Sequence, residues 1–192
     1  MTTNGTAPDD DARLVARAVM GDDAAIEKLV RRHIDAAFAV ALAVLGDRDE
    51  AEDVCQDAMV RALERLGDCR HPERFGAWLA EIVRNRAHNS RAYAKVRATQ
   101  ELAEHTAPSP NGASEGVERA ELRRRIHVAL GALTEMQRLV VFLHDMQGYA
   151  HHEIAELLHI SETSSRQYLF VARKRLRTDL GPELMEDYAR EP

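Results

Sequence analysis

The residues with the most specific chemistry lie near the end of this 192-residue chain. A run of five side chains carries hydroxyl, guanidinium and amide groups, which are the groups that hydrogen-bond to base edges in the major groove of DNA. The run consists of Thr163, Ser164, Ser165, Arg166 and Gln167. Further along the same segment come Arg173, Lys174 and Arg177, whose charges suit a phosphate backbone. DNA is therefore the first partner that the sequence predicts.

The elements around this run are those that would place it in a groove. Ile154, Leu157 and Leu158 give the preceding segment one apolar face with helical spacing. A tight turn is predicted at His159–Ser161, and a second helix is predicted to begin at Glu162. Two helices joined in this way form a helix-turn-helix, whose second helix presents its first residues to DNA. At the turn, His159 occupies a position that favours a left-handed backbone, which histidine tolerates better than most residues.

A second basic stretch runs from Arg84 to Arg97 and contains five basic residues and no acidic ones. Asn85, His88 and Asn89 are interleaved with the cations. Basic side chains hold phosphates, while amides and rings contact unpaired bases. The alternative interpretation is a solvated helix end, stabilised by the helix dipole.

Residues 47 to 57 are strongly acidic, with Asp53, Gln56 and Asp57 at their end. Carboxylates at a helix N-terminus stabilise the helix dipole, and this alone explains much of the pattern. The functional alternative is a docking face for a basic protein partner, since DNA would be repelled here. Composition alone leaves both interpretations open.

Bulk composition limits the class of protein. The net charge is -6, and only two cysteines occur, which is too few for a disulfide framework. The first residues are polar and contain no apolar signal-peptide core. No apolar run approaches the roughly 18 residues of a membrane span. We therefore expect a cytoplasmic protein without membrane contact.

The histidines raise the alternative of a metal-dependent enzyme. His144, His151, His152 and His159 cluster in the sequence, but their spacing fits no familiar zinc motif. No nucleophile elbow, Walker loop or glycine-rich dinucleotide loop occurs. We expect no metal site, no cofactor and no enzymatic activity.

Hydrophobic periodicity predicts an all-α fold with two small helical domains joined by a flexible linker. Asp22 is expected to cap a helix that ends at Gly46, and Thr134 with Gln137 is expected to form a capping box. The predicted divisions are a disordered N-terminus (1–10), a helical bundle (11–97), a linker (98–117), a helix-turn-helix domain (118–180) and a tail (181–192).

Together these stretches resemble the sigma-70 family of bacterial transcription initiation factors, in its compact extracytoplasmic-function group. The resemblance covers nearly the whole chain, without its first ten or so residues, the linker and the tail. Four stretches carry it, in the order of that family's regions 2 and 4: M-G-D-D-A-A-I-E-K-L-V (20–30), A-E-D-V-C-Q-D-A (51–58), F-G-A-W-L-A-E-I-V-R-N-R-A-H-N (75–89) and the segment from Glu153 to Arg177.

The resemblance implies an alternative sigma factor for a stress- or signal-responsive set of genes, with core RNA polymerase, promoter DNA and an anti-sigma factor as partners. It implies that Asp53, Gln56 and Asp57 bind the polymerase. The residues implied to contact melted DNA at the −10 element are Arg74, Phe75, Arg84, Asn85, His88, Asn89 and Arg91. Those implied to contact the −35 element are Thr163, Ser164, Ser165, Arg166, Gln167, Arg173, Lys174 and Arg177.

The chain departs from the family pattern at the turn, where His159 replaces glycine, and at the start of the second helix. These departures concern the choice of promoter rather than docking to the polymerase. A stand-alone two-domain helix-turn-helix regulator is the alternative function. It would leave the acidic stretch and the segment from Trp78 to Asn89 unexplained.

Overall fold

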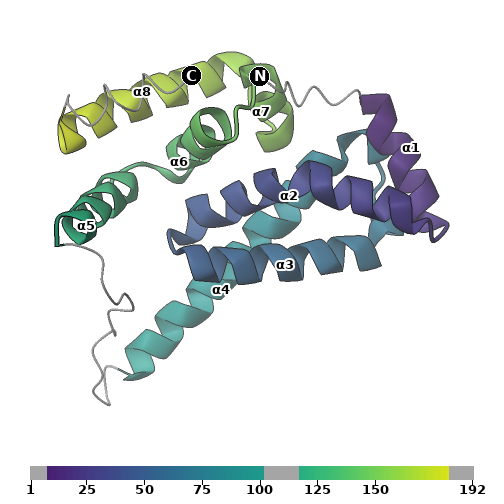
Figure 1. The fold of residues 1–192 in the computed structure, drawn as a ribbon, viewed down its shortest axis with the longest axis horizontal. Helices are drawn as coiled ribbons and strands as arrows, with labels where there is room; N and C mark the ends of the chain where they lie inside the picture. The colour runs from purple at the N-terminus through teal and green to yellow at the C-terminus, as the bar shows by residue number, and fades with distance from the viewer. Residues whose placement is uncertain (1–7, 102–116, 182–192) are drawn as a thin grey trace.

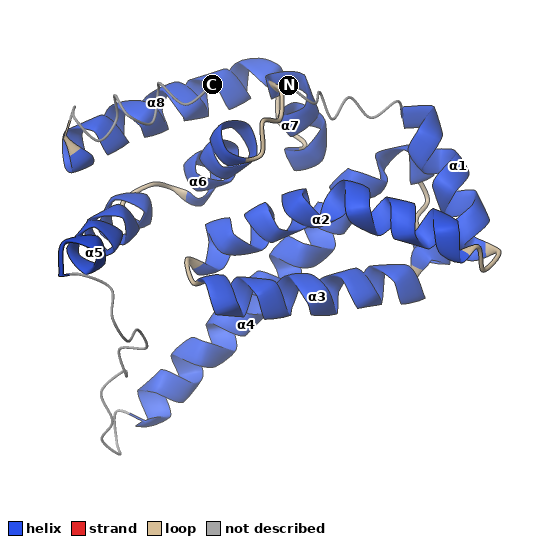
Figure 2. Ribbon diagram, viewed as in Figure 1, coloured by secondary structure: helices blue, strands red, loops and turns tan. Residues whose placement is uncertain are grey.

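A computed structural model describes residues 8–101 and 117–181, which form helices and connecting turns and include no strand (Figure 2). The predicted all-α class is thus confirmed. The elements are α1 (Pro8–Val19), α2 (Asp23–Leu45), α3 (Arg48–Glu64), η1 (Leu66–Asp68), η2 (Pro72–Arg74), α4 (Phe75–Glu101), α5 (Val117–Gly131), α6 (Glu135–Val141), η3 (Phe142–Met146), α7 (His151–Leu158) and α8 (Glu162–Leu180).

The N-terminal lobe, α1 to α4, is a bundle around the long helix α2 (Figure 1). The Asp22 side chain accepts a hydrogen bond from the Ala25 amide, and Gly46 ends the helix in a left-handed conformation, so both predicted ends of α2 are confirmed. Many of the buried residues of α2 are alanines, which let α3 and α4 approach closely.

The C-terminal lobe, α5 to α8, carries the helix-turn-helix. Thr134 and Gln137 form the predicted capping box at the start of α6. Helices α7 and α8 pack against each other, and α8 also packs against α5 and α6. The predicted helix-turn-helix is therefore present, with α8 as its second helix.

The two lobes lie against each other rather than apart. Helix α2 contacts α6 and η3, helix α4 contacts α7, and the buried apolar residues form one continuous cluster across both lobes. Gly76 of α4 mainly serves packing within the N-terminal lobe, because an added Cβ there would lie 3.1 Å from the His33 ring of α2, whereas Leu157 Cδ1 of α7 would lie at an ordinary contact distance of 3.5 Å.

The ends of the expected linker are helical, since α4 continues to Glu101 and α5 begins at Val117. The rest of that linker, residues 102–116, lies outside the described residues, as do nearly all of the tail and residues 1–7. Helix α1 begins at Pro8, within the segment expected to be disordered.

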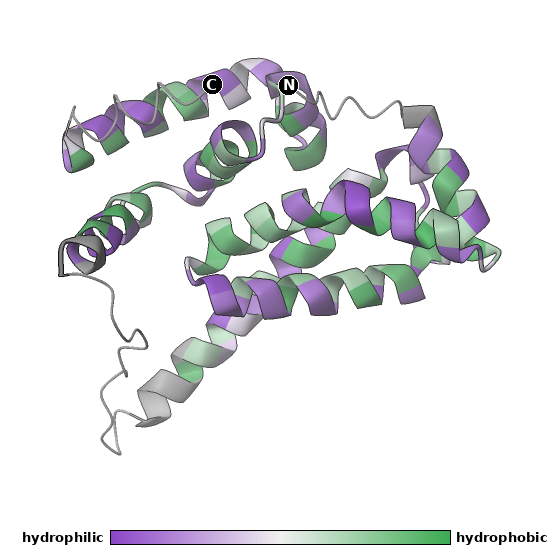
Figure 3. Cartoon of the chain, viewed as in Figure 1, coloured by the Kyte–Doolittle hydropathy of each residue, from purple (hydrophilic) through white to green (hydrophobic). Residues whose placement is uncertain are grey.

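Most helices carry both apolar and polar residues (Figure 3). Among residues 8–101 and 117–181, no helix is both long and apolar enough to cross a membrane. Cys55 and Cys69 are free thiols buried in the N-terminal lobe, and burial raises the pKa of Cys55 to about 11.

The turn between α7 and α8 generates a prediction about stability. His159 has φ 54° and ψ 45°, the left-handed region that was predicted for it. We expect His159→Gly to stabilise the protein by up to about 1 kcal/mol, because glycine adopts this conformation without a steric penalty. We expect His159→Val to destabilise it by about 1–2 kcal/mol. Urea unfolding of the two variants measures both changes, and equal stabilities would contradict the assignment of strain to this residue.

Candidate nucleic-acid and protein-binding surfaces

The start of α8 is held in place by its own side chains. Ser161 caps the helix, accepting a hydrogen bond from the Ser164 amide at 3.0 Å. Thr163, Arg166 and Gln167 are exposed, and Ser164 is half-buried. Arg166 forms an ion pair with Glu162 one turn earlier in the helix. Three flexible or polar side chains therefore project from the first turns of α8, as base readout requires.

Ser165 differs from its predicted role. Its side chain is fully buried, and its Oγ lies 2.9 Å from His151 Nδ1 of α7. A side chain in this position cannot reach a base edge while the lobe is folded. Ser165 fits the role of a residue that positions α8 against α7. Its helical spacing from the buried Leu169, Ala172 and Leu176 is the sequence signal that could have indicated this.

The later turns of α8 form a basic surface around an exposed aromatic ring. Arg173, Lys174 and Arg177 are exposed, and Phe170 among them is 70% exposed. Together with Arg166 and Leu169 they line a shallow groove. The arrangement offers several cations to a phosphate backbone along one side of the helix.

A polar network beneath α8 fixes its direction. The Asp145 carboxylate, whose side chain is 3% exposed, accepts a hydrogen bond from Arg173 Nε at 3.2 Å and lies 2.9 Å from His144 Nδ1. The His144 ring stacks on His151, with centroids 4.6 Å apart. Burial alone would raise the pKa of Asp145, but the hydrogen bonds from His144 and Arg173 outweigh burial and hold it below its ordinary value of 3.8.

The predicted −10 residues of η2 and α4 divide into three groups by burial. Arg74, Asn85, His88, Asn89 and Arg91 are exposed, Arg84 is half-buried, and Phe75 is fully buried. Phe75 packs edge-on against His33 at 5.1 Å and beside Trp78, so its ring serves the core and cannot stack on a base. The prediction that Phe75 contacts DNA does not fit this structure.

Two of these residues, His88 and Arg84, face the other lobe. His88 Nε2 lies 3.2 Å from a carboxylate oxygen of Glu135, the first residue of α6, and Arg84 Nε lies 3.9 Å from the other oxygen of that carboxylate. The Arg91 guanidinium donates to the Val44 carbonyl at 3.5 Å, near the end of α2. These contacts join residues far apart in the sequence.

The acidic helix α3 presents Asp53 and Gln56 to solvent, whereas Asp57 is half-buried. Asp57 forms ion pairs with Arg61 of its own helix and with Arg86 of α4. Two guanidinium groups thus neutralise much of its charge, and Asp57 joins α3 to α4. The exposed negative face of α3 accordingly consists of Asp53 and its neighbours, with Asp57 at its edge.

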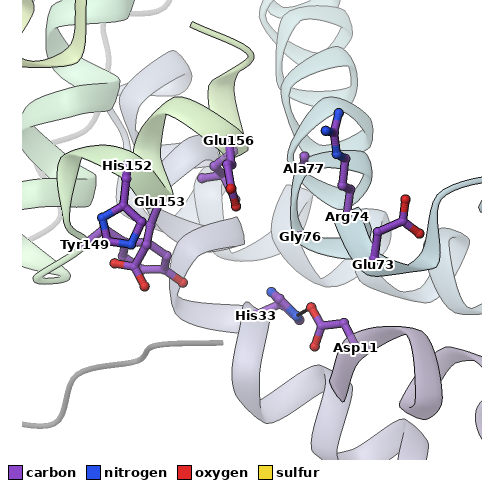
Figure 4. A pocket seen from close by; sticks show the side chains of 11 residues that line it. Asp11, His33, Glu73, Arg74, Gly76, Ala77, Tyr149, His152, Glu153 and Glu156 are labelled. Carbon is purple, nitrogen blue, oxygen red and sulfur yellow. Dashed lines mark hydrogen bonds and ion pairs between the residues drawn. The ribbon is translucent and has the colours of Figure 1, made fainter. Parts of the chain in front are cut away.

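A cavity of about 260 Å³ lies between the lobes (Figure 4). The buried pair of Asp11 and His33, joined at 2.9 Å, lines it from the N-terminal lobe, and Tyr149 and Glu153 line it from the C-terminal lobe. Burial, with Glu153 nearby, raises the pKa of Tyr149 to about 12, so its phenol stays neutral. Within the described parts of the chain, no three histidine, cysteine or acidic side chains are grouped so as to hold a metal ion.

Fold and surfaces define an all-helical protein with a bundle lobe and a helix-turn-helix lobe. Comparison with known proteins identifies the family: residues 29–97 match Sigma-70 region 2, and residues 123–176 match Sigma-70, region 4. The chain therefore belongs to the sigma-70 family of RNA polymerase sigma factors, in its extracytoplasmic-function (ECF) group. It is a transcription initiation factor and not an enzyme, and the matched pair of regions excludes the stand-alone regulator.

Individual relatives agree with this assignment. The chain is 32% identical to the ECF RNA polymerase sigma factor SigM of Mycobacterium tuberculosis over 171 residues, which cover 89% of this chain and 85% of the relative. It is 30% identical to the probable RNA polymerase sigma factor RfaY of Xanthomonas campestris, covering 85% of this chain but 42% of that longer protein. Among solved structures, CnrH in complex with the cytosolic domain of CnrY is similar, with TM-score 0.62, 27% identity, and coverage of 89% of this chain and 97% of CnrH.

The contact between Asp145 and Arg173 generates a second stability prediction. We expect Asp145→Asn to destabilise the protein by about 1.5–3 kcal/mol, because the neutral amide replaces a buried carboxylate that holds two charged or polar partners. Asp179→Asn is the matched control, since Asp179 forms an ion pair with Arg175 on the surface of α8 and should cost about 0.5 kcal/mol or less. Urea unfolding tests the pair, and similar losses in both variants would refute the role given to Asp145.

His151 generates a prediction about pH. Burial, together with the nearby charges of His144 and Arg166, lowers the pKa of His151 below its ordinary value of 6.5. The unfolded chain therefore takes up this proton at a higher pH than the folded chain, so acidification just below pH 6.5 destabilises the fold. We expect the melting temperature to fall between pH 7 and about pH 5.5, with a smaller fall for His151→Gln. Parallel slopes for both proteins would exclude His151 as the cause.

Proposed function

We propose that this sigma factor binds core RNA polymerase through the exposed acidic face of α3, with Asp53 and Gln56 at its centre. In this proposal Asp57 has a double role, because its ion pair with Arg86 also fixes α3 to α4. The exposed carboxylates suit a basic surface of the polymerase, where charge complementarity speeds association and orients the partner.

Promoter DNA is proposed to contact two further surfaces. On α4 and the turn before it, Arg74, Arg84, Asn85, His88, Asn89 and Arg91 would bind the melted −10 strand. On α8, Thr163, Ser164, Arg166 and Gln167 would read the −35 element in the major groove, while Arg173, Lys174 and Arg177 would hold phosphates. Ser165 and Phe75 would position these surfaces from within the core.

The observation that carries the proposal is that acidic and basic surfaces lie on different helices of a fold that matches the family. An acidic exposed face lies on α3, and cationic or amide-bearing exposed faces lie on α4 and α8. The faces on α4 and α8 would each bind DNA weakly alone, but attachment of the chain to the polymerase through α3 raises the effective concentration of both at the promoter.

The expected cellular location and partners of the protein follow from this role. A bacterial sigma factor works where polymerase and chromosome are, so we expect a cytoplasmic protein that directs expression of a stress- or signal-responsive set of genes. An anti-sigma factor is a further expected partner, since the similar CnrH was solved with the cytosolic domain of CnrY bound.

Transcription from fragmented genomic DNA of the source organism tests the proposal. Core polymerase with this chain should start transcripts at a small set of sites that share −10 and −35 sequences, and core polymerase alone should not. Starts that are unchanged by adding the chain would refute the proposed function.

The promoters found in this way allow a test of base readout on α8. We expect Arg166→Ala to weaken open-complex formation by about 1–3 kcal/mol and to abolish discrimination at one −35 base pair, because a guanidinium bidentate to guanine is lost. Arg175→Ala is the matched control, since Arg175 is exposed on the same helix and pairs with Asp179. If both variants discriminate as the wild type does, Arg166 does not read the promoter.

A further inference from the structure

A buried ionic cluster joins α1 to α2 within the N-terminal lobe. The Asp11 carboxylate of α1, whose side chain is 5% exposed, accepts hydrogen bonds from Arg32 Nη1 at 2.6 Å and from His33 Nε2 at 2.9 Å. The preceding residue, Asp10, also forms an ion pair with Arg32, and within the described chain its other charged partner is Arg13 rather than His33. Asp11 is therefore the residue of α1 that binds His33.

His33 connects this cluster to the start of α4. Its ring packs edge-on against the fully buried ring of Phe75, with centroids 5.1 Å apart. An added Cβ at Gly76 would lie 3.1 Å from the His33 ring, so glycine allows the ring to lie against the backbone of the first turn of α4. The hydrogen bond to Asp11 fixes the rotation of the same ring, because a polar pair has a defined geometry.

The first turn of α4 follows directly on η2, which carries Arg74. Helix α1 packs against η2, and the Phe75 amide donates a hydrogen bond to the Pro72 carbonyl at the start of η2. Figure 4 shows the Arg74 side chain extending away from the joined pair of Asp11 and His33. One peptide bond thus separates an exposed cation from a buried ring, and a displacement of that ring would move the cation.

We propose that Asp11 and His33 are positioning residues for the −10 contact. They hold Phe75, and through it the η2 turn, at the place where Arg74 reads the melted strand. This inference rests on the proposed function of η2 and α4. Asp11 and His33 are buried and do not touch DNA, so their effect on promoter choice passes through Phe75 to Arg74. Recognition depends on such supporting residues, because a contact group must be held close to its productive geometry.

The test compares two neighbouring variants of the full chain. Asp11→Ala and Asp10→Ala each remove one carboxylate partner of Arg32, but only the first removes the partner of His33. Open-complex formation with core polymerase is measured on one promoter and on two altered forms of it. One form carries a change at the −10 base pair where Arg74→Ala loses the most discrimination, and the other carries a change at a −35 base pair.

The rate on the unchanged promoter divided by the rate on each altered form gives a −10 ratio and a −35 ratio. A variant that is merely less stable lowers all the rates alike and leaves both ratios unchanged. We expect Asp11→Ala to lower the −10 ratio by about threefold or more and to keep the −35 ratio, whereas Asp10→Ala keeps both.

A second variant makes the test independent of the folding of Asp11→Ala. His33→Gln retains an N–H donor for Asp11 but lacks the ring that packs on Phe75, so it should also lower the −10 ratio. In an Arg74→Ala background, His33→Gln should have no further effect, because both changes act on one contact. A full −10 ratio in His33→Gln, additive effects of the two changes, or full −10 discrimination in Arg74→Ala would each overturn the proposal.

These outcomes are distinguishable from failure of the proposed function. If wild type and Asp10→Ala direct specific starts while His33→Gln keeps the full −10 ratio, only the positioning role is refuted. If the wild type directs no specific starts, the proposed function fails, and the positioning role fails with it.

Discussion

The end of α2 is the point on which the arrangement of the two lobes depends. A helix leaves its last carbonyls without partners, and the last turn of α2 has no cation of its own. Arg138 of α6 and Arg91 of α4 donate to Ala43 and Val44 there. Since the two arginines come from different lobes, satisfying one helix end ties the C-terminal lobe to the bundle. The apolar seam between α4 and α7 then closes beside this anchor.

Inside the C-terminal lobe, a few buried polar groups fix the helix that carries the DNA-reading residues. Ser165 meets His151, and Asp145 meets Arg173, so α8 is attached to both α7 and η3. Polar pairs of this kind have a defined geometry, which an apolar contact lacks. These two contacts fix the orientation of α8 about its own axis, so its exposed residues face solvent. On the other lobe, Asp57 and Arg86 join α3 to α4 in a similar way.

Local signals in the sequence predicted much of this. The caps of α2, the capping box at Thr134, and the helix-turn-helix with left-handed His159 all depend on residues within a few positions of one another. The burial of Phe75 and Ser165 was predictable only in part. Helical spacing places them on the apolar faces of α4 and α8, but it does not show which helix covers each face. The pairing of His88 with Glu135 spans 47 residues, and that of Arg138 with Ala43 spans 95. No periodicity within one helix encodes such contacts, so the packing of the two lobes against each other could not be predicted from the sequence.

The central claim is that the C-terminal lobe lies against the bundle because Arg138 of α6 binds the end of α2. The distance between the lobes measures this directly, with dyes on cysteines introduced at the exposed positions Met20 and Val128, since Cys55 and Cys69 are buried. Energy transfer should be efficient in the wild-type chain and should fall in Arg138→Ala, which loses the hydrogen bond to Ala43. Transfer that is equal in the two proteins, or that is already low in the wild type, would contradict the account.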